Sequence, residues 1–272
     1  MPKDRSFYTD ANRDAWNETA PRHARANQER LLSDFAQPGH VDLGDHLIRA
    51  LQTVGVSGKS VVQLCCNNGK DLLSVKNMGA GSCVGVDGSA PFIEQACEIA
   101  RVAGHTDTVR FIASDIYALP DEFDGRFDIT LVTIGVLSWL PDLKGFFDRA
   151  CNTIKPGGHL VIEEMHPVLF MYEPGTDGQP SELTYSYFNK EPFVEQDGLD
   201  YYTGETYDSK PMYSFQHKLD DIIMTGIACG LNLRHFEELP YDISLFCADL
   251  ENAVAKPPLG FTMVWEKTAL PG

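Results

Sequence analysis

The sequence lacks long apolar runs and clusters of positive charge. None of its hydrophobic runs approaches the roughly 20 residues that a transmembrane helix needs, and the segment 1–6 has no apolar core of the kind found in secretory signals. The 39 Asp and Glu residues outnumber the 22 Lys and Arg, which gives a formal net charge of −17. Because nucleic acids and anionic membranes are bound through clustered cations, the composition predicts no nucleic acid and no membrane partner.

The spacings that mark metal and dinucleotide sites are also missing. The seven cysteines are an odd number, Cys65 and Cys66 are adjacent, and no His-Glu-x-x-His is present. These features predict reduced thiols in a cytoplasmic protein and no metal site. The segment 65–69 lacks the Gly-x-Gly-x-x-Gly spacing of dinucleotide-binding loops, which weighs against a nicotinamide dehydrogenase. At 272 residues without repeats, the chain is long enough for one large α/β domain.

One stretch, residues 61–75, organises the rest of the chain. An apolar run at 61–64 passes into the small and turn-forming residues 65–69, and helical apolar spacing follows at 72–75. This strand, loop and helix place backbone N–H groups at the carboxyl end of a strand, where open α/β sheets bind ligands. A second strand at 82–86 ends in Asp87, whose two carboxylate oxygens suit a ribose diol. Together these features predict a ligand that contains a nucleoside.

Five motifs in order carry a resemblance to a known family. They are the loop Gln63 to Gly69, Asp87, the segment Ala113 to Ile116, the segment Phe127 to Ile129, and the segment Lys155 to Glu164. In order and spacing they resemble the class I S-adenosylmethionine (SAM) dependent methyltransferases of the small-molecule branch, over about residues 45–270. The first motif of that family usually begins with an acidic residue and carries two or three glycines, whereas this chain has Gln63 and keeps only Gly69. The Gln63 amide can still bond the amino acid end of SAM, without offering charge to its ammonium.

The resemblance implies an α/β fold with a Rossmann-like, seven-stranded methyltransferase sheet and helices on both faces. Residues 1–42 are expected to form an N-terminal helical lid, and residues 43–272 the SAM-binding domain. Alternation of strand and helix up to residue 164 independently predicts a parallel sheet. The segment 165–216 is rich in aromatic residues and turn formers, so we expect it to form a β cap that is inserted after strand five and sets substrate specificity.

Local patterns predict where the elements lie. In the lid, Asp10 is expected to cap a helix over 11–20, and Pro21 to open a second helix that runs to Phe35. In the cap, strands are expected at 183–188 and 212–216. The remaining expected elements are helices at 43–54, 90–104, 143–154, 219–230 and within 241–253, and strands at 109–113, 127–133, 159–164, 231–237 and 261–267.

The resemblance also implies which residues bind SAM and, after transfer, S-adenosylhomocysteine (SAH). Asp115 corresponds to the position that receives the adenine amino group, with Ile116 against the ring, although Asp115 can equally be a loop cap. The expected cofactor-binding residues belong to the lid and to the carboxyl ends of the first four strands: Tyr8, Trp16, Gln63, Cys65, Asn67, Asn68, Gly69, Asp87, Gly88, Ser89, Ser114, Asp115, Ile116, Thr133, Ile134 and Gly135.

Catalytic candidates are fewer, because positioning alone supplies much of the rate of a methyl transfer. A base helps when the acceptor is a hydroxyl or a protonated amine. His166 and Glu164 follow strand five, and His217 follows the cap, so these three residues are the candidates. Each can equally be structural. A reactive thiol at Cys65 or Cys66 is a further option, since helix N-termini lower thiol pKa values.

The leading hypothesis is a SAM-dependent methyltransferase that acts on nitrogen or oxygen of a small aromatic or heterocyclic metabolite, as a monomer or homodimer. Two alternatives remain. One is an enzyme that uses the SAM pocket for chemistry other than methylation, and the other is a non-catalytic binding protein of the same fold. The presence of Gly69, Asp87 and Asp115 weighs against a non-catalytic protein, because a degenerate pocket would have little reason to retain all three.

Overall fold

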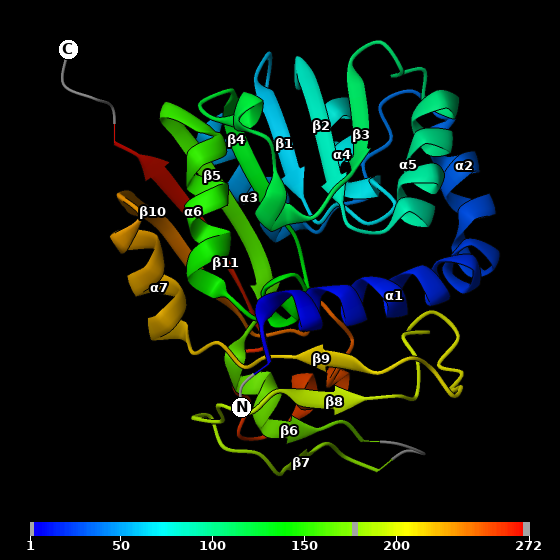
Figure 1. Cartoon of the computed structure of the whole chain (residues 1–272), viewed down its shortest axis with the longest axis vertical. Helices are drawn as coiled ribbons and strands as arrows, with labels where there is room; N and C mark the ends of the chain where they lie inside the picture. The colour runs from blue at the N-terminus through cyan, green and yellow to red at the C-terminus, as the bar shows by residue number, and fades with distance from the viewer. Residues whose placement is uncertain (1–2, 176–178, 269–272) are drawn as a thin grey trace.

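The computed structural model describes residues 3–175 and 179–268, and its centre is a seven-stranded mixed sheet (Figure 1). The strand order is β10-β11-β5-β4-β1-β2-β3. The five central strands are parallel, and β11 pairs antiparallel with both β5 and β10. This confirms the predicted fold. The strands are β1 (Ser60–Leu64), β2 (Ser82–Asp87), β3 (Val109–Ala113), β4 (Phe127–Val132), β5 (Ile154–Met165), β10 (Leu231–Leu239) and β11 (Gly260–Lys267).

Helices cover both faces of the sheet and divide its core into two clusters. Leu64 packs with α6 and α7 on one face, while Val61 packs with α2 to α5 on the other. Successive side chains of a strand point to opposite faces, so buried apolar residues without alternation are what a sheet covered on both sides requires. The helices are α1 (Arg5–His23), α2 (Glu29–Phe35), α3 (Asp45–Val54), α4 (Lys70–Asn77), α5 (Ala90–Val102), α6 (Leu143–Thr153) and α7 (Leu219–Ala228).

The N-terminal segment differs from the prediction. Asp4, not Asp10, caps α1 by accepting a hydrogen bond from the Phe7 amide at 3.0 Å, so the helix begins six residues earlier than expected. Pro21 lies inside α1 instead of opening a new helix, and the π-helical segment Ala24–Gln28 follows it. Proline has no N–H to donate, and the helix accommodates Pro21 by changing from α-helical to π-helical hydrogen bonding shortly after it. Helix α1 crosses the carboxyl ends of the parallel strands (Figure 1).

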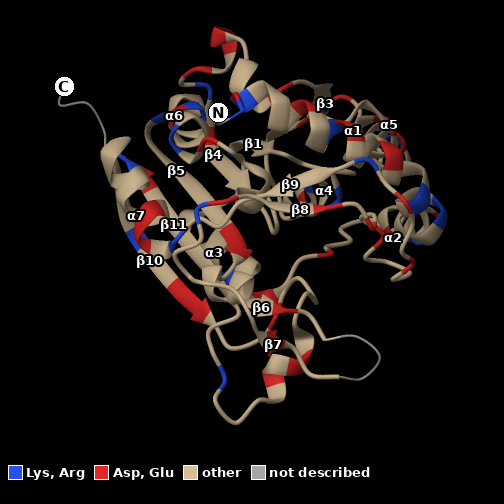
Figure 2. Cartoon of the chain, turned by 60° about the horizontal axis from the view of Figure 1, so that its bottom comes forward, with Lys and Arg blue, Asp and Glu red and all other residues tan. Residues whose placement is uncertain are grey.

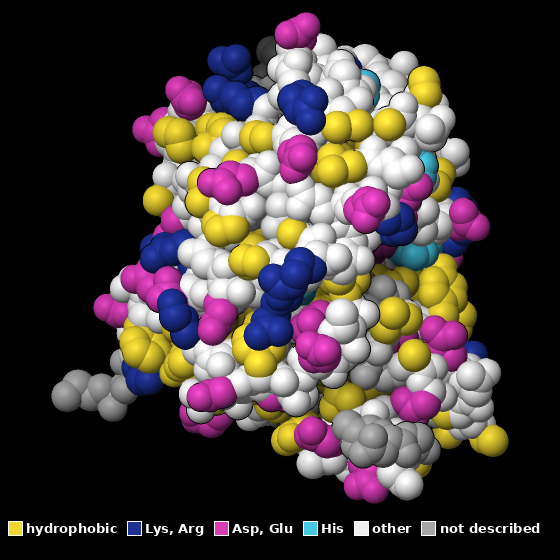
Figure 3. Space-filling model, turned by 90° about the vertical axis from the view of Figure 1, so that its right-hand side faces the viewer, with side chains coloured by type: hydrophobic (Ala, Val, Ile, Leu, Met, Phe, Trp, Pro, Cys, Tyr) yellow, Lys and Arg dark blue, Asp and Glu magenta, His cyan; other side chains and the backbone are white. Residues whose placement is uncertain are grey.

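The insertion after β5 forms two small antiparallel pairs, β6 (Tyr172–Glu173) with β7 (Glu182–Leu183) and β8 (Phe193–Glu195) with β9 (Met212–Ser214). The expected strand at 183–188 is therefore wrong beyond Leu183, because the next two amides both donate to the carbonyl of Met171 and turn the chain. Figure 3 shows the surface hollowed where this insertion meets the body of the molecule.

One further boundary was predicted incorrectly. Strand β5 begins at Ile154, five residues before the expected start, because the turn-forming sequence Pro156-Gly157-Gly158 lies inside a long strand whose first residues pair with β4. The short helix expected within 241–253 is the 3₁₀ helix Ala248–Asn252. Asp242 organises the segment that precedes it, where its carboxylate accepts the amides of Ser244 and Cys247.

Candidate functional site

The loop between β1 and α4 adopts a conformation that favours glycine. Its residues Cys65, Asn67 and Gly69 have φ values of 57°, 49° and 75°, in the left-handed region. A Cβ atom on Gly69 would meet the Phe111 ring at 2.5 Å, so glycine is required there for space as well as conformation. At the other two positions, a small thiol and an asparagine stand where the resembled family uses glycine, at a cost of about 1 kcal/mol each.

Asp87, at the end of β2, holds this loop in place. One carboxylate oxygen accepts the Asn67 amide at 2.8 Å, and the other accepts the Ser89 amide at 2.8 Å. Burial raises the pKa of Asp87, and the two amides oppose that shift. Each oxygen retains a lone pair for another donor. The adjacent Gly88 lies under Arg13 of α1, whose side-chain carbons would be 3.9 Å from a Cβ at this position.

The ends of β1 and β4 meet through Gln63 and Thr133. The Gln63 Nε2 donates to the Thr133 hydroxyl at 2.8 Å, and both residues are buried. The other atom of the amide, Oε1, is buried without a hydrogen-bond partner. An unsatisfied buried acceptor costs about 1–3 kcal/mol, so this oxygen is suited to a donor that a ligand brings.

The turn after β3 is placed by the same carboxyl edge. The Ser114 amide donates to the backbone carbonyl of Asp87 at 2.8 Å, which sets the two strand ends side by side. Asp115 is exposed and accepts the Tyr117 amide at 2.9 Å, so it does cap a short helix. Its second oxygen is free for an adenine amino group. Ile116 is buried in the core beside the site.

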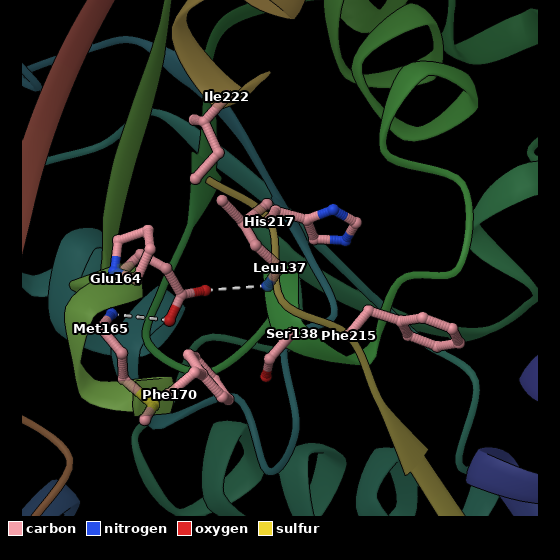
Figure 4. A pocket seen from close by; sticks show the side chains of 9 residues that line it. Leu137, Ser138, Glu164, Met165, Phe170, Phe215, His217 and Ile222 are labelled. Atoms are coloured by element: carbon pink, nitrogen blue, oxygen red, sulfur yellow. Dashed lines mark hydrogen bonds between the residues drawn. The ribbon is translucent and has the colours of Figure 1, made fainter. Parts of the chain in front are cut away.

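Glu164 organises the segment after β4. Its carboxylate accepts three backbone amides, those of Gly135 at 2.6 Å, Leu137 at 2.8 Å and Met165 at 2.8 Å. Figure 4 shows the bonds to Leu137 and Met165. Burial raises the pKa of Glu164 to about 7, against the effect of these amides. The buried carboxylate therefore fixes the path of residues 134–137, which include Ile134 and Gly135 of the expected cofactor site.

Helix α1 joins the sheet edge to the insertion. Trp16 packs edge-to-face on Trp139 at 5.5 Å and on Phe92 at 5.9 Å, measured between ring centroids. Tyr8 packs in the same way on Phe215 at 5.2 Å. Asn12 adds two hydrogen bonds to the backbone of β9. The half-buried Trp139 thus lies between α1 and the sheet edge.

The structure separates the two histidine candidates. His217 and Glu164 line one cavity, with Ser138 and Phe170, that has a volume of about 10 Å³, room for roughly one water (Figure 4). Because a carbonyl only accepts, the 2.8 Å contact with Leu140 O fixes the proton of His217 on Nε2 and leaves Nδ1 as an acceptor. Burial lowers the pKa of His217, which favours its neutral form.

His166 has a different environment. Its Nδ1 accepts the Val168 amide at 3.2 Å, which caps the 3₁₀ helix Pro167–Met171, and its Nε2 lies 3.3 Å from the Glu238 carboxylate. It is buried and does not line the cavity that holds His217. His166 therefore has a structural environment, and the structure gives it no contact with the other two candidates.

The surroundings of Cys65 and Cys66 do not favour the option of a reactive thiol. Burial raises the pKa of both Cys65 and Cys66, and the Asp87 carboxylate raises both further. Desolvation and a nearby negative charge outweigh the helix N-terminus here. Within residues 3–175 and 179–268, no three His, Cys, Asp or Glu side chains are placed to hold a metal ion.

A second polar cluster was missed by sequence reasoning. Glu163 contacts the His46 Nε2, and the Tyr241 hydroxyl lies 3.1 Å from the His46 Nδ1. The three residues come from β5, from the start of α3 and from the segment after β10. Only the position of Glu163, one residue before Glu164 and hence on the opposite face of the strand, was a signal in the sequence.

Comparison with known proteins identifies the domain. Residues 61–158, which contain the loop, Asp87 and the Glu164-bound segment 134–137, match the family model of a methyltransferase domain. This match, together with the fold, supports a class I SAM-dependent methyltransferase. SAM is the cofactor of that family, and SAH is what remains of it after methyl transfer.

Relatives of this methyltransferase vary in extent. A malonyl-[acyl-carrier protein] O-methyltransferase of Prosthecochloris aestuarii is 29% identical over 140 residues, 48% of this chain and 44% of that protein. The chain thus spans less than half the length of that relative. A SAM-dependent methyltransferase structure from Mesorhizobium loti has a TM-score of 0.61 at 18% identity and covers 82% of this chain and 99% of its own. Such likenesses show the fold.

A further solved structure is similar over nearly the whole chain. The structure of 1,6-didemethyltoxoflavin-N1-methyltransferase from Burkholderia thailandensis matches with a TM-score of 0.60 and 13% identity, over 98% of this chain and 92% of its own. That structure holds 1,6-didemethyltoxoflavin and S-adenosylhomocysteine. For this methyltransferase, no helix among residues 3–175 and 179–268 is both long and apolar enough to cross a bilayer.

The residues at the carboxyl edge fit the chemistry of SAM. The orphaned Oε1 of Gln63 is an acceptor for an α-ammonium group, and the free lone pairs of Asp87 are acceptors for a ribose diol. Gly135 has a φ of 84° and no heavy atom within 4 Å of where its Cβ would lie, so its backbone borders open space. The free acceptors along this edge are thus complementary to the hydrogen-bond donors of an adenosyl amino acid.

Proposed function

We propose that this methyltransferase binds SAM across the carboxyl ends of β1 to β4 and transfers its methyl group to nitrogen or oxygen of a small-molecule acceptor. The observation that carries the proposal is the unpaired Gln63 Oε1 beside the Gly69 loop and the Asp87 carboxylate. The remaining cofactor contacts are the expected ones, from Tyr8 and Trp16 of the lid to the backbone of residues 133–135.

In this proposal SAM supplies an electrophilic methyl group, and the chain supplies position and a proton acceptor. Glu164 holds residues 134–137 through their amides, so that the backbone beside the reacting centre is rigid before substrate binds. Positioning of this kind contributes on the order of 7–11 kcal/mol in favourable cases. His217, with its free Nδ1, is the proposed base for a hydroxyl acceptor, at a typical gain of about 10²- to 10⁴-fold.

We further propose that residues 1–42 act as a lid and residues 165–216 as an acceptor cap. Support comes from the contacts of α1 with both the sheet edge and β9. A small aromatic or heterocyclic acceptor is favoured by the aromatic side chains of Trp139 and Phe215 near the edge. The relative from Burkholderia thailandensis, which extends over nearly the whole chain, holds a heterocyclic acceptor.

Calorimetric titration with SAM, SAH and NAD tests the cofactor site. We expect the two adenosyl ligands to bind and NAD not to bind. The change Asp87→Ala removes both ribose acceptors and should weaken SAH by about 100-fold or more, since hydrogen bonds to charged groups contribute about 1.5–3 kcal/mol each. Asp121→Ala, in an exposed turn, is the matched control. Unchanged SAH affinity in Asp87→Ala would reject the site.

Transfer itself requires a separate assay with trideuteromethyl SAM and a metabolite extract. We expect mass spectrometry to detect products that carry the labelled methyl group on nitrogen or oxygen. A protein that binds SAM and converts metabolites into products without the label would support the alternative, an enzyme that uses the SAM pocket for other chemistry.

A further inference from the structure

The face of the sheet opposite Glu164 carries a row of polar side chains at its carboxyl edge. Leu131 of β4 pairs in register with Gln63 of β1 and with Val161 of β5, and paired residues of parallel strands share a face. Two residues further along each strand, Thr133 and Glu163 therefore lie on that same face. All the polar members of the row, Gln63, Thr133 and Glu163, are at least nine-tenths buried.

Glu163 is oriented by a chain of hydrogen bonds from two other elements. Its carboxylate can only accept, so the His46 Nε2 donates to it, and the His46 Nδ1 accepts from the Tyr241 hydroxyl at 3.1 Å. This arrangement assigns the imidazole tautomer and holds the carboxylate in one direction. Burial raises the pKa of Glu163, the Asp71 charge raises it further, and His46 and Lys70 oppose the shift.

Neighbouring cations are already paired. The Lys70 ammonium bonds the Asp71 carboxylate at 2.7 Å and the Asp42 carbonyl at 3.2 Å. Arg49 of α3 is paired with Glu237 of β10 at 2.9 Å. Asp45 begins α3, and β10 carries the acidic residues Glu237 and Glu238; Figure 2 shows acidic positions in red on β10. The region around Glu163 therefore offers acceptors and negative charge and would repel an anionic group.

Two buried acceptor atoms of the same face have no partner. They are the Gln63 Oε1 and the hydroxyl oxygen of Thr262, which pairs in register with Glu163 from β11. Buried polar atoms are almost always bonded, so these two unpartnered atoms, an amide oxygen that accepts and a hydroxyl that can donate or accept, point to polar groups that a ligand brings. The α-ammonium of SAM accounts for the Gln63 atom, which leaves Glu163 and Thr262 to a second ligand.

We propose that Glu163, held by His46 and Tyr241, binds the protonated amine of the acceptor. The inference rests on the proposed function and makes nitrogen its target, with His217 then shaping the pocket instead of taking the proton. An ammonium N–H bond breaks and its proton passes to the Glu163 carboxylate. The freed lone pair forms the bond to the methyl carbon, while the carbon–sulfur bond breaks and its electron pair goes to sulfur. A carboxylic acid acceptor would meet like charge here.

The test uses full-length protein saturated with SAH and titrated with benzylamine, benzyl alcohol or benzoate as probes. We expect benzylamine to bind at least about tenfold more tightly than either other probe. Glu163→Gln should remove that preference, while SAH affinity stays within about twofold. Glu182→Gln, an exposed glutamate of the insertion, is the matched control and should retain the preference.

A milder variant guards against loss of folding in Glu163→Gln. Tyr241→Phe keeps the ring and removes the hydroxyl that donates to His46 and also contacts Arg49. It should weaken benzylamine binding by about two- to fivefold at unchanged SAH affinity. If wild-type protein fails to bind SAH, the proposed function itself is rejected. If it binds SAH but shows no preference for the amine, or if both variants retain the preference, the assignment of Glu163 alone is overturned.

Discussion

Two glutamates that are neighbours in the sequence have unlike environments. Glu164 faces α6 and α7 and is satisfied by three backbone amides, whereas Glu163 faces α3 and α4 and is held by the imidazole of His46. Strand alternation alone sends them to opposite faces. The comparison teaches that backbone partners make Glu164 a structural brace, whereas Glu163, which is held by a side chain, is the carboxylate that we propose to bind a ligand.

The largest expected effect is the loss of stability on removing the Glu164 carboxylate. Glu164→Ala leaves three buried amides without an acceptor and should reduce the free energy of unfolding by about 3 kcal/mol, given costs of about 1–3 kcal/mol for each unsatisfied group. Urea unfolding followed by circular dichroism measures this. A loss below about 1 kcal/mol would mean that water replaces the carboxylate, and Glu164 would not be a brace.

The next effect depends on pH. The pKa of Glu164 is raised from 4.5 to about 7 in the folded protein, so the folded state holds this proton more tightly than the unfolded state does. Its contribution is therefore fully present below about pH 4.5 and is lost as the pH rises to about 7, by roughly 1–3 kcal/mol. Compared with Glu164→Gln, which cannot titrate, wild-type protein should lose stability over this range. A constant difference between the two would contradict the shift.

Gln63→Met tests whether the orphaned oxygen serves a ligand. The change removes a buried atom without a partner and the bond to Thr133, so stability should change by less than about 1 kcal/mol. Affinity for SAH should fall by about tenfold, because the ammonium loses its acceptor. Thr133→Val, which removes only the internal bond, is the control. Equal losses in both variants would assign Gln63 a packing role.

The smallest effect on stability is expected for Glu163, the carboxylate that we propose to bind the acceptor. Glu163→Gln keeps one oxygen to accept from His46 and should change the free energy of unfolding by less than about 1 kcal/mol. Unfolding measured in parallel with Glu164→Ala shows the contrast directly. Similar losses for the two variants would remove the distinction between brace and ligand site.

Much of the fold and of the cofactor edge could be predicted from the sequence. Alternating strands and helices, and Asp87 at a strand end, are local signals that fix what lies at the carboxyl edge. Helix α1 was misplaced because Pro21 was treated as a boundary, whereas a π-helical segment accommodates it. The long strand β5 was shortened because glycines were read as a turn.

The partners of Glu163 could not be predicted in the same way. His46 and Tyr241 are separated from it by many residues, and nothing in their spacing places them together. Their meeting depends on how α3 packs on β5 and β11, which is a tertiary property. Likewise, which nitrogen of His217 is free depends on one contact with a segment distant in sequence, the carbonyl of Leu140.

The most direct test of the account is a hydrogen-exchange footprint of SAH on the whole chain, with Asp87→Ala as the control. The account predicts slower amide exchange in segments 65–69, 87–89, 114–116 and 133–137, and no such protection in the variant. Protection confined to other segments, or none at saturating SAH, would contradict the claim that the carboxyl edge of β1 to β4 holds the cofactor.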